Sequence, residues 1–255
     1  MRSANKLKER LRRGDTVLGT WSVLPSPAGA NVIAAAGFDF LIIDMEHGPA
    51  SFETAEDMVR AVEGAGATPL VRVPTNLDWL ILRGLEIGAH GVVVPQIVTA
   101  RDARAAVAAV KYHPEGERGF SPFTRSGGYT ALHADRLAAR ENAQTLSVLL
   151  VEGVAGVQNL DDILGVPEID VIYLGTYDLS QSAGHPGQPD HPEVVAFVER
   201  CVERIRARGV AAGCLAQSQA DVERWHSIGI QFIAYLADCA LLFHACLDVR
   251  RRFPA

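Results

Sequence analysis

Short runs of β-branched and aliphatic residues alternate with longer amphipathic segments along the whole chain, and this alternation constrains the fold more than any other feature. The short runs predict strands at about 16–24, 39–46, 69–73, 91–96, 146–152, 170–175, 210–216 and 231–237. Apolar residues at helical spacing predict helices between the strands, including one for which Ser51 is a suitable N-cap. Strands that alternate with helices in this way indicate an α/β fold with a parallel sheet.

The number of these units indicates which α/β fold is formed. Eight strand–helix units in 255 residues are typical of a single (β/α)8 TIM barrel. A doubly wound sheet is the alternative, but it would need a nucleotide-binding glycine loop, and no G-x-G-x-x-G follows the first strand. No linker rich in Pro, Gly or Ser divides the chain. We therefore expect one barrel domain spanning residues 1–255.

The composition excludes several functional classes. The net charge is −6 and no basic run occurs, so we expect no nucleic-acid partner. No apolar run approaches the roughly 20 residues of a membrane span, and residues 1–13 lack the apolar core of a signal peptide. The four cysteines show no metal-binding spacing and are expected to be reduced core thiols of a cytoplasmic protein: Cys201, Cys214, Cys239 and Cys246.

Ionisable residues cluster where the second predicted strand ends, in the stretch LIIDMEHGP at 41–49. Burying a charge without a partner is costly, so such residues must be exposed, paired or used in a site. In a (β/α)8 barrel the carboxyl ends of the strands form the mouth where active sites lie. The residues that the predicted strands bring to this mouth are Trp21, Asp44, Glu46, His47, Arg72, Gln96, Glu152 and Asp178.

Two of these acids predict a metal site. Glu152 ends the fifth strand and Asp178 follows the sixth, and neighbouring strands lie roughly 4.8 Å apart, so both carboxylates can converge on one cation. Carboxylates without nearby Cys or His ligands suit a hard ion such as Mg²⁺ or Mn²⁺. The alternative, which the spacing leaves equally open, is that each acid is a surface or helix-capping carboxylate.

Arg72 and His47 are candidates for catalysis. Arg72 lies within a strand and needs a partner, which at a barrel mouth can be an anion or a developing oxyanion; the alternative is an ion pair with Glu46 or Glu86. His47 is either a general base, because imidazole titrates near neutral pH, or a simple loop histidine. No lysine lies at a strand's carboxyl end, so a Schiff base is not expected and carbanion chemistry would rely on a metal.

Several motifs together resemble the HpcH/HpaI aldolase family. They are GFDFLIIDMEHGP, LVRVP, GAHGVVVPQI, EGERGF, VEGVAGVQNLDDIL and YLGTYDLSQSAGHPGQPDHPEV, and the similarity extends over about 19–249. Members of this family are class II pyruvate aldolases that act on 2-keto-3-deoxy acids. The resemblance implies a divalent cation (Mg²⁺, Mn²⁺ or Co²⁺) held by Glu152 and Asp178, and no organic cofactor.

The resemblance also implies roles for the other residues at the mouth. Arg72 would hold the keto or enolate oxygen, and His47 would be the acid/base, paired with an acid at the position of Glu86. Asp44 would support the site. Trp21 would line the pocket, and the backbone amides that would bind the substrate carboxylate are those of Gly175, Thr176 and Tyr177.

The chain departs from the family pattern in three places. It has Gly-Thr-Tyr-Asp-Leu-Ser where better-known members have G-P-A-D-L-S, and Leu150 where they often have Gln. The loop 118–130 also differs: Arg118 and Arg125 could bind an anionic aldehyde or brace a neighbouring subunit, and a solvated, subunit-bridging loop is at least as well supported. These departures leave the acceptor aldehyde open.

The histidines outside the mouth are interpreted as structural. The segment 184–192, GHPGQPDHP, contains two of them, and we expect a rigid loop that caps the next helix rather than a second metal site. The others lie away from the carboxyl ends of the strands: His90, His113, His133, His226 and His244.

These observations predict an enzyme that reversibly cleaves a 4-hydroxy-2-oxo acid to pyruvate and an aldehyde. A 2-oxo-acid decarboxylase or an acyl-CoA lyase could use the same site. An alternative of another class is a non-catalytic barrel that serves as an assembly or regulatory partner. The resemblance further implies a homo-oligomer, a trimer or hexamer, in which the C-terminal helix at about 239–253 is exchanged between subunits.

Overall fold

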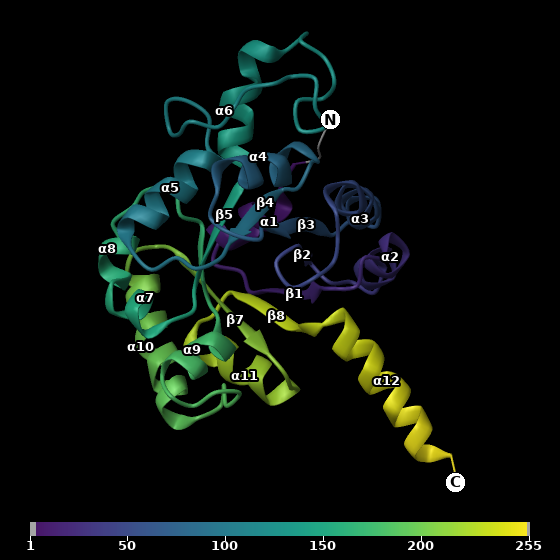
Figure 1. The fold of residues 1–255 in the computed structure, drawn as a ribbon, viewed down its shortest axis with the longest axis vertical. Coiled ribbons are helices and arrows are strands. Elements are labelled where there is room, and N and C mark those ends of the chain that lie inside the picture. The colour runs from purple at the N-terminus through teal and green to yellow at the C-terminus, as the bar shows by residue number, and fades with distance from the viewer. Residues whose placement is uncertain (1–3, 254–255) are drawn as a thin grey trace.

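The computed structural model describes residues 4–253 and contains a closed barrel of eight parallel strands (Figure 1). Each strand pairs with the next one along the chain, and β8 closes the barrel against β1. The strands are β1 (Val17–Ser22), β2 (Phe40–Asp44), β3 (Thr68–Arg72), β4 (Gly91–Val94), β5 (Leu146–Val151), β6 (Val171–Leu174), β7 (Ala211–Ala216) and β8 (Phe232–Ala237). All eight predicted strands and the predicted (β/α)8 barrel are confirmed.

Helices α2 to α11 lie between consecutive strands on the outside of the barrel, whereas α1 precedes β1 and α12 follows β8 (Figure 1). They are α1 (Lys6–Arg12), α2 (Pro27–Ala35), α3 (Phe52–Gly64), α4 (Asp78–Glu86), α5 (Ala100–Val110), α6 (Ala134–Gln144), α7 (Val154–Gln158), α8 (Leu160–Leu164), α9 (Thr176–Ser182), α10 (Pro192–Ala207), α11 (Gln219–Ile228) and α12 (Asp238–Arg252). Ser51 caps α3 as predicted, since its side chain accepts a hydrogen bond from the N–H of Thr54.

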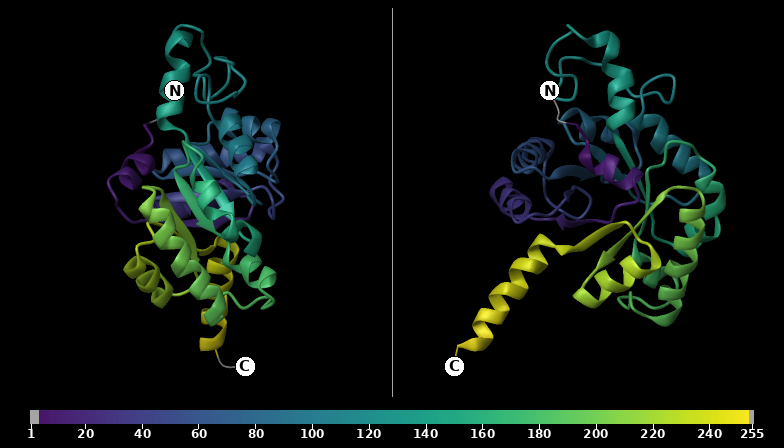
Figure 2. Two further views of the ribbon diagram at one scale, coloured as in Figure 1. Left: turned by 90° about the vertical axis from the view of Figure 1, so that its left-hand side faces the viewer. Right: turned by 180° about the vertical axis from the view of Figure 1, so that it is seen from behind.

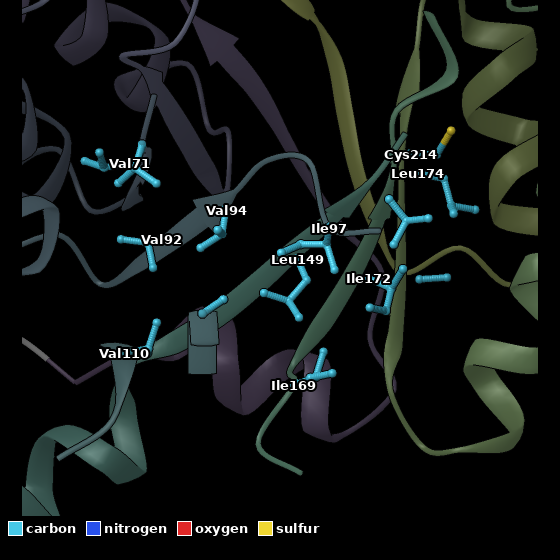
Figure 3. Close-up of a cluster of buried hydrophobic side chains, with 14 of the residues drawn as sticks. Val71, Val92, Val94, Ile97, Val110, Leu149, Ile169, Ile172, Leu174 and Cys214 are labelled. Atoms are coloured by element: carbon cyan, nitrogen blue, oxygen red, sulfur yellow. The ribbon is translucent and has the colours of Figure 1, made fainter. Parts of the chain in front are cut away.

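The alternation of side chains along each strand divides the apolar residues into two layers. Phe40 and Ile42 fill the barrel interior, where Phe40 stacks on Phe232 at 4.0 Å between ring centroids. Leu41 and Ile43 point outward into the larger core between the strands and the helices. Figure 3 shows part of this outer core, which is built from valine, isoleucine and leucine side chains. The charged residues of the strands, Asp44 and Arg72, accordingly lie at strand ends.

Helix α1 closes the amino end of the barrel. The Asn5 side chain donates hydrogen bonds to the carbonyls of His90 and Gln144, at 3.0 and 2.7 Å. The buried Lys8 ammonium donates to the carbonyl of Thr145 and to the carboxylate of Asp170, each at 2.9 Å. Substrate access is therefore restricted to the opposite end, where the strands terminate.

The loop 118–130 lies at this closed amino end, not at the mouth. Arg118 donates to Oε1 of Glu86, the last residue of α4, at 2.6 Å. Arg125 is paired with Glu63 in the last turn of α3. Helices of the barrel run antiparallel to the strands, so their carboxyl ends lie at the amino end of the sheet. The interpretation that Arg118 and Arg125 bind an anionic aldehyde within this chain's own cavity is therefore wrong.

Helix α12 extends away from the barrel, as the right-hand view in Figure 2 shows, and it makes few contacts with the strands. Cys239 and Cys246 are exposed on this helix, so their assignment as core thiols is wrong, whereas Cys201 and Cys214 are buried as expected. All four are free thiols. Between residues 4 and 253, no helix combines the length and apolar character needed to cross a membrane.

Candidate active site at the barrel mouth

The carboxyl ends of the strands surround a cavity of about 480 Å³. Its volume lies within the roughly 300–1,000 Å³ that is usual for small-molecule sites. The lining residues are Trp21, Val23, Asp44, His47, Arg72, Leu150, Glu152, Tyr173, Gly175, Thr176, Tyr177, Asp178, Leu215, Gln217, Leu236, Ala237 and Ala240. The structure thus brings together most of the residues that the sequence places at the mouth.

A buried ion pair between Arg72 and Asp44 forms the floor of this cavity. Arg72 ends β3 and Asp44 ends β2, and the two are aligned in the parallel register. Nε of Arg72 donates to Oδ1 of Asp44 at 2.8 Å, and Nη2 contacts Oδ2. A guanidinium has five N–H donors and this pairing uses two of them. The remaining donors are available to Glu46 and to a substrate oxygen.

Asp44 also positions the residues that follow it. Its Oδ1 accepts the backbone N–H groups of Glu46 and His47, at 3.0 and 3.2 Å. An aspartate that accepts from the amides two and three residues later stabilises a tight turn. These contacts explain the three ionisable residues in the stretch LIIDMEHGP. Asp44 pairs with Arg72, and it fixes the turn that carries Glu46 and His47.

The aromatic side of the cavity holds Arg72 in place. Its guanidinium lies over the ring of Trp21, 4.4 Å from the ring centroid. Nε1 of Trp21 donates to the hydroxyl of Tyr173 at 3.1 Å, and the two rings meet edge to face. Burial raises the pKa of Tyr173 well above its ordinary value, so its hydroxyl stays protonated near neutral pH and acts as a neutral support.

Glu46 and Gln96 connect Arg72 to the acidic side of the cavity. Oε2 of Glu46 lies 3.1 Å from Nη1 of Arg72, which confirms one of the two partners expected for this arginine. Nε2 of Gln96 donates to Oε1 of Glu46 at 3.3 Å. Gln96 has a φ of +59°, a strained conformation for a residue with a Cβ. Its backbone N–H donates to Oε1 of Glu152 at 2.8 Å.

Glu152 and Asp178 lie next to each other at the ends of β5 and β6. Val151 and Leu174 are partners in the parallel register, Glu152 follows directly, and Asp178 lies in the first turn of α9. Burial raises the pKa of Glu152 to about 7, and the negative charge of Asp178 contributes to the shift. The two carboxylates are therefore close enough to repel each other, an arrangement that a cation stabilises.

The space beside Glu152 depends on a glycine. A Cβ on Gly175 would lie 2.7 Å from Cβ of Glu152 and 3.2 Å from its Oε2. A donor set of two carboxylates suits a hard divalent cation. The one histidine that lines the cavity, His47, follows β2, whereas the two acids follow β5 and β6. The residues present thus fit the predicted Mg²⁺ or Mn²⁺ site.

Two of the expected roles need correction. Glu86 is paired with Arg118 and Ser126 at the amino end of the barrel, so it can partner neither Arg72 nor His47 within the chain. The backbone N–H of Gly175 donates to the carbonyl of Val151 at 3.1 Å, because the sheet ladder continues to this residue. It is therefore not available to a substrate carboxylate.

The amides of Thr176 and Tyr177 remain suitable for an anion. They lie in the first turn of α9, where backbone N–H groups have no partner within the helix. Both residues line the cavity next to Asp178. His47 is exposed on the opposite side of the cavity, on the turn after β2.

The segment 184–192 forms the expected helix cap. His191 is the N-cap of α10, and its Nδ1 accepts the N–H of Glu193 at 3.3 Å. Ligand atoms of His185, His191 and Glu193 lie within 4.8 Å of one another. The two imidazole rings are stacked at 3.5 Å and 16°, however, so their in-plane lone pairs run nearly parallel rather than converging on one ion. None of the five other histidines lines the cavity.

Sequence reasoning assigned no site role to the other residues that line the cavity, most of which come from β6, β7, β8 and the segments after them. They are Val23 after β1, Leu150 on β5, and Tyr173, Leu215, Gln217, Leu236, Ala237 and Ala240. Most lie at the carboxyl ends of predicted strands, and this position was the signal that could have identified them. Leu236 has a φ of +51°, so a second strained residue borders the site.

Comparison with known proteins is consistent with this site. The model of the HpcH/HpaI aldolase/citrate lyase family matches residues 18–245. A pyruvate aldolase of Rhizobium etli is 36% identical over 250 residues, which cover 98% of this chain and 97% of that protein. A hydroxypyruvate/pyruvate aldolase of Roseobacter denitrificans is 34% identical over 241 residues, 94% of this chain and 93% of that protein.

A solved structure shows the same fold. The crystal structure of an HpcH/HpaI aldolase/citrate lyase family protein from Burkholderia cenocepacia superposes with a TM-score of 0.91. It is 32% identical in sequence, and the match covers 97% of this chain and 98% of that chain.

Proposed function

Because the chain belongs to the HpcH/HpaI aldolase/citrate lyase family and matches pyruvate aldolases over nearly its whole length, we propose that the cavity at its barrel mouth is the active site of a divalent-metal-dependent aldolase. The enzyme reversibly cleaves a 4-hydroxy-2-oxo acid to pyruvate and an aldehyde. The observation that carries this function is that Glu152, Asp178 and Arg72 line one cavity.

Glu152 and Asp178 are the residues that would hold the cation, Mg²⁺ or Mn²⁺ by the hardness of their oxygen donors. When bound, such a cation supplies a Lewis acid that polarises the keto group of the pyruvyl moiety. The hydrogen bond from the N–H of Gln96 fixes one oxygen of Glu152. A ligand that is itself hydrogen-bonded keeps its orientation, which supports a defined site.

Arg72 would stabilise the negative charge that develops on the keto oxygen during cleavage. It is already oriented by Asp44 and by the ring of Trp21, so little reorganisation is needed when the charge appears. The amides of Thr176 and Tyr177 would bind the carboxylate of the same pyruvyl group. These contacts fix both polar ends of the three-carbon donor.

His47 would move the proton of the reaction. In the cleavage direction its imidazole accepts the proton from the 4-hydroxyl group, and in the synthetic direction it returns that proton to the new alkoxide. The position of His47 on the turn fixed by Asp44 supports this assignment. An imidazole ring can both accept and donate a proton, which suits transfer in both directions.

Helix α12 would contact another copy of the chain in a homo-oligomer. Leu242, Phe243 and Val249 on this helix are 58%, 63% and 56% exposed, an unusual amount for large apolar side chains on one element. The helix leaves the barrel rather than packing along it (Figure 1). Exchange of α12 between subunits would bury these residues.

Exchange of the methyl protons of pyruvate with D₂O tests the proposed function without the aldehyde. With chelator-treated protein we expect exchange only after Mn²⁺ is added, with the metal removed before the proton NMR spectrum is recorded. Glu152→Gln and Asp178→Asn should each lower the exchange rate more than about 100-fold. A group that only orients a metal ligand contributes at most about 100-fold, so a larger loss identifies a ligand. Asp162→Asn, an exposed acid on α8, is the matched control. Exchange without metal, or undiminished exchange in both variants, would contradict the proposal.

A further inference from the structure

Asp238 is a buried carboxylate at the barrel mouth that the proposed mechanism leaves unused. It is the first residue of α12 and is buried. Its neighbours Ala237 and Ala240 line the cavity, but Asp238 is not itself a lining residue. The oxygens of a buried carboxylate need hydrogen-bond donors. These donors show which parts of the mouth Asp238 holds together.

The partners of Asp238 lie at the end of β1 and in the turn that follows it. The hydroxyl of Ser22 donates to Oδ2 at 2.8 Å, and the backbone N–H of Val23 donates to Oδ1 at 2.9 Å. The N–H of Leu24 lies 3.3 Å from Oδ1 and 3.2 Å from Oδ2. Hydrogen bonds to an ionised group are stronger than those between neutral groups. Asp238 therefore ties the start of α12 to the end of β1.

The pairing of β1 with β8, which closes the barrel, is irregular near the mouth. Gly19 is aligned with Ala234 and Trp21 with Ala237, so the pairing advances two residues along β1 but three along β8. The extra residue of such a bulge is left unpaired, and the ladder of hydrogen bonds is disrupted locally. The side-chain bonds of Asp238 thus hold the end of β1 at the place where the sheet holds it least.

The end of β1 contacts the surroundings of two groups that the proposed reaction uses. The ring of Trp21 covers the guanidinium of Arg72, with 4.4 Å between the ring centroid and Cζ. In addition, a Cβ on Gly48 would lie 3.0 Å from the carbonyl oxygen of Val23. The turn after β1 therefore packs closely against the backbone next to His47. A shift of this segment would disturb the orientation of Arg72 first, because the contact with Trp21 is direct.

We propose that Asp238 is a positioning residue for the aldolase reaction, which fixes the end of β1 and, through Trp21, the orientation of Arg72. This inference rests on the proposed function. The proposed metal ligands, Glu152 and Asp178, come from the end of β5 and from α9, so the loss of Asp238 should lower turnover and leave metal affinity unchanged. A misplacement of about 1 Å in a site can lower the rate about 100-fold, which sets the upper limit of the expected effect.

Asp238→Ala tests the effect on turnover. The measured quantities are kcat/KM for Mn²⁺-dependent exchange of the methyl protons of pyruvate in D₂O and the Mn²⁺ affinity from calorimetry. We expect kcat/KM to fall about 10- to 100-fold, with the Mn²⁺ affinity and the circular dichroism spectrum unchanged. A residue that only stabilises the fold would lower both quantities or neither. Asp248→Ala, which changes an exposed acid of the same helix, is the matched control.

A double-mutant cycle tests whether Asp238 acts through Trp21. Trp21→Leu removes the ring that covers Arg72. If the effect of Asp238 passes through this ring, the double variant should exchange pyruvate within about twofold of Trp21→Leu alone, whereas the effects of independent sites would multiply. Ser22→Ala removes a single hydrogen bond to Asp238. It should show the same dependence on Trp21 with a smaller fall, and it serves as the test if Asp238→Ala does not fold.

The outcomes distinguish this inference from the function on which it rests. If the wild type exchanges pyruvate and the folded variants of Asp238 and Ser22 exchange it equally fast, the assignment of Asp238 is wrong and the aldolase site stands. Effects of Asp238→Ala and Trp21→Leu that multiply, or a parallel loss of Mn²⁺ affinity, would also overturn the inference. If the wild type exchanges no pyruvate in the presence of Mn²⁺, the proposed function itself is wrong.

Discussion

Arg72 is oriented by three different neighbours before any substrate is present. Asp44 binds two of its N–H groups, Glu46 faces a third, and the ring of Trp21 covers one face of the guanidinium. A buried cation in this setting is stabilised only if its geometry satisfies all of these partners. The planar shape of the side chain is therefore as important as its charge.

Substitution of Arg72 by lysine should separate shape from charge. Arg72→Lys keeps a positive charge but cannot pair with Asp44 through two parallel hydrogen bonds. We expect turnover to fall about 100- to 1,000-fold, as when a donor to a developing oxyanion is removed, with Mn²⁺ affinity retained in calorimetry. Arg83→Lys on the exposed face of α4 is the control. Turnover close to that of the wild type would remove Arg72 from the mechanism.

Gly175 is a second position where one atom decides the geometry of the site. Gly175→Ala would place a Cβ 2.7 Å from Cβ of Glu152, so the glutamate must shift and Mn²⁺ affinity should fall at least about tenfold. Gly153→Ala provides a matched control directly beside Glu152, because its Cβ would lie 3.6 Å from Oγ of Ser182, an ordinary contact. Calorimetric titration with Mn²⁺ compares the two variants. Equal affinities would show that the space beside Glu152 is not needed.

Among the secondary-structure elements, α1 has a role that its position in the sequence does not suggest. Leu7 and Leu11 pack into the same cluster as the barrel interior, while Asn5 and Lys8 bind carbonyl groups at the amino end. The helix thus acts as a plug that covers the end opposite the cavity. One of the two lysines of this helix, Lys8, is buried.

The buried ammonium of Lys8 makes stability depend on pH. Burial lowers the pKa of Lys8 from 10.5 to about 8, with Asp170 opposing the shift. Between these two values the unfolded chain binds more protons than the native protein, so the contribution of this group to the free energy of unfolding rises with pH. The rise is at most about 1.4 kcal/mol for each pH unit.

Chemical denaturation of the wild type and of Lys8→Met between pH 7.5 and 10.5, roughly the range between the two pKa values, measures this effect. We expect the wild type to gain stability relative to Lys8→Met as the pH increases, since the other titrating groups are common to both proteins. Lys6→Met, which changes an exposed lysine of the same helix, should show no such trend. A difference between wild type and Lys8→Met that is constant over this range would contradict the assignment.

For the whole molecule, the barrel separates two ends with different functions. The mouth carries the cavity, whereas the amino end carries α1 and the ion pairs of Glu86 with Arg118 and of Glu63 with Arg125. Helix α12 and the loop preceding α6 project on opposite sides of the barrel in all views (Figures 1 and 2). Both segments expose large apolar side chains, among them Phe243 and Phe123.

The proposed homo-oligomer can be tested by sedimentation velocity. Each exposed apolar residue of α12 that is buried at an interface contributes roughly 1.5–3 kcal/mol. We expect the wild type to sediment as an oligomer and the double variant Leu242→Asp, Phe243→Asp to sediment as a smaller species with an unchanged circular dichroism spectrum. Arg251→Asp, at the exposed end of the same helix, controls for the added charge. A monomeric wild type would exclude the exchange of α12.

The sequence by itself determined the barrel and the side of it on which the site lies. Eight apolar runs that alternate with amphipathic segments predict eight strands, and Asp44, Arg72, Glu152 and Asp178 lie at or just beyond the carboxyl ends of theirs. Both inferences depend on local periodicity, which a sequence shows directly. They also depend on the parallel arrangement of the strands, which the alternation of strands and helices implies.

The tertiary structure alone decided which side chains are partners. It paired Glu86 with Arg118 instead of His47, engaged the amide of Gly175 in the sheet, and joined Tyr177 to Gln217 across two strand ends. Such contacts join residues that are far apart in the chain, and their geometry depends on how helices and loops pack on the barrel. Periodicity along the chain carries no information about that packing, so it locates a site without specifying the hydrogen bonds within it.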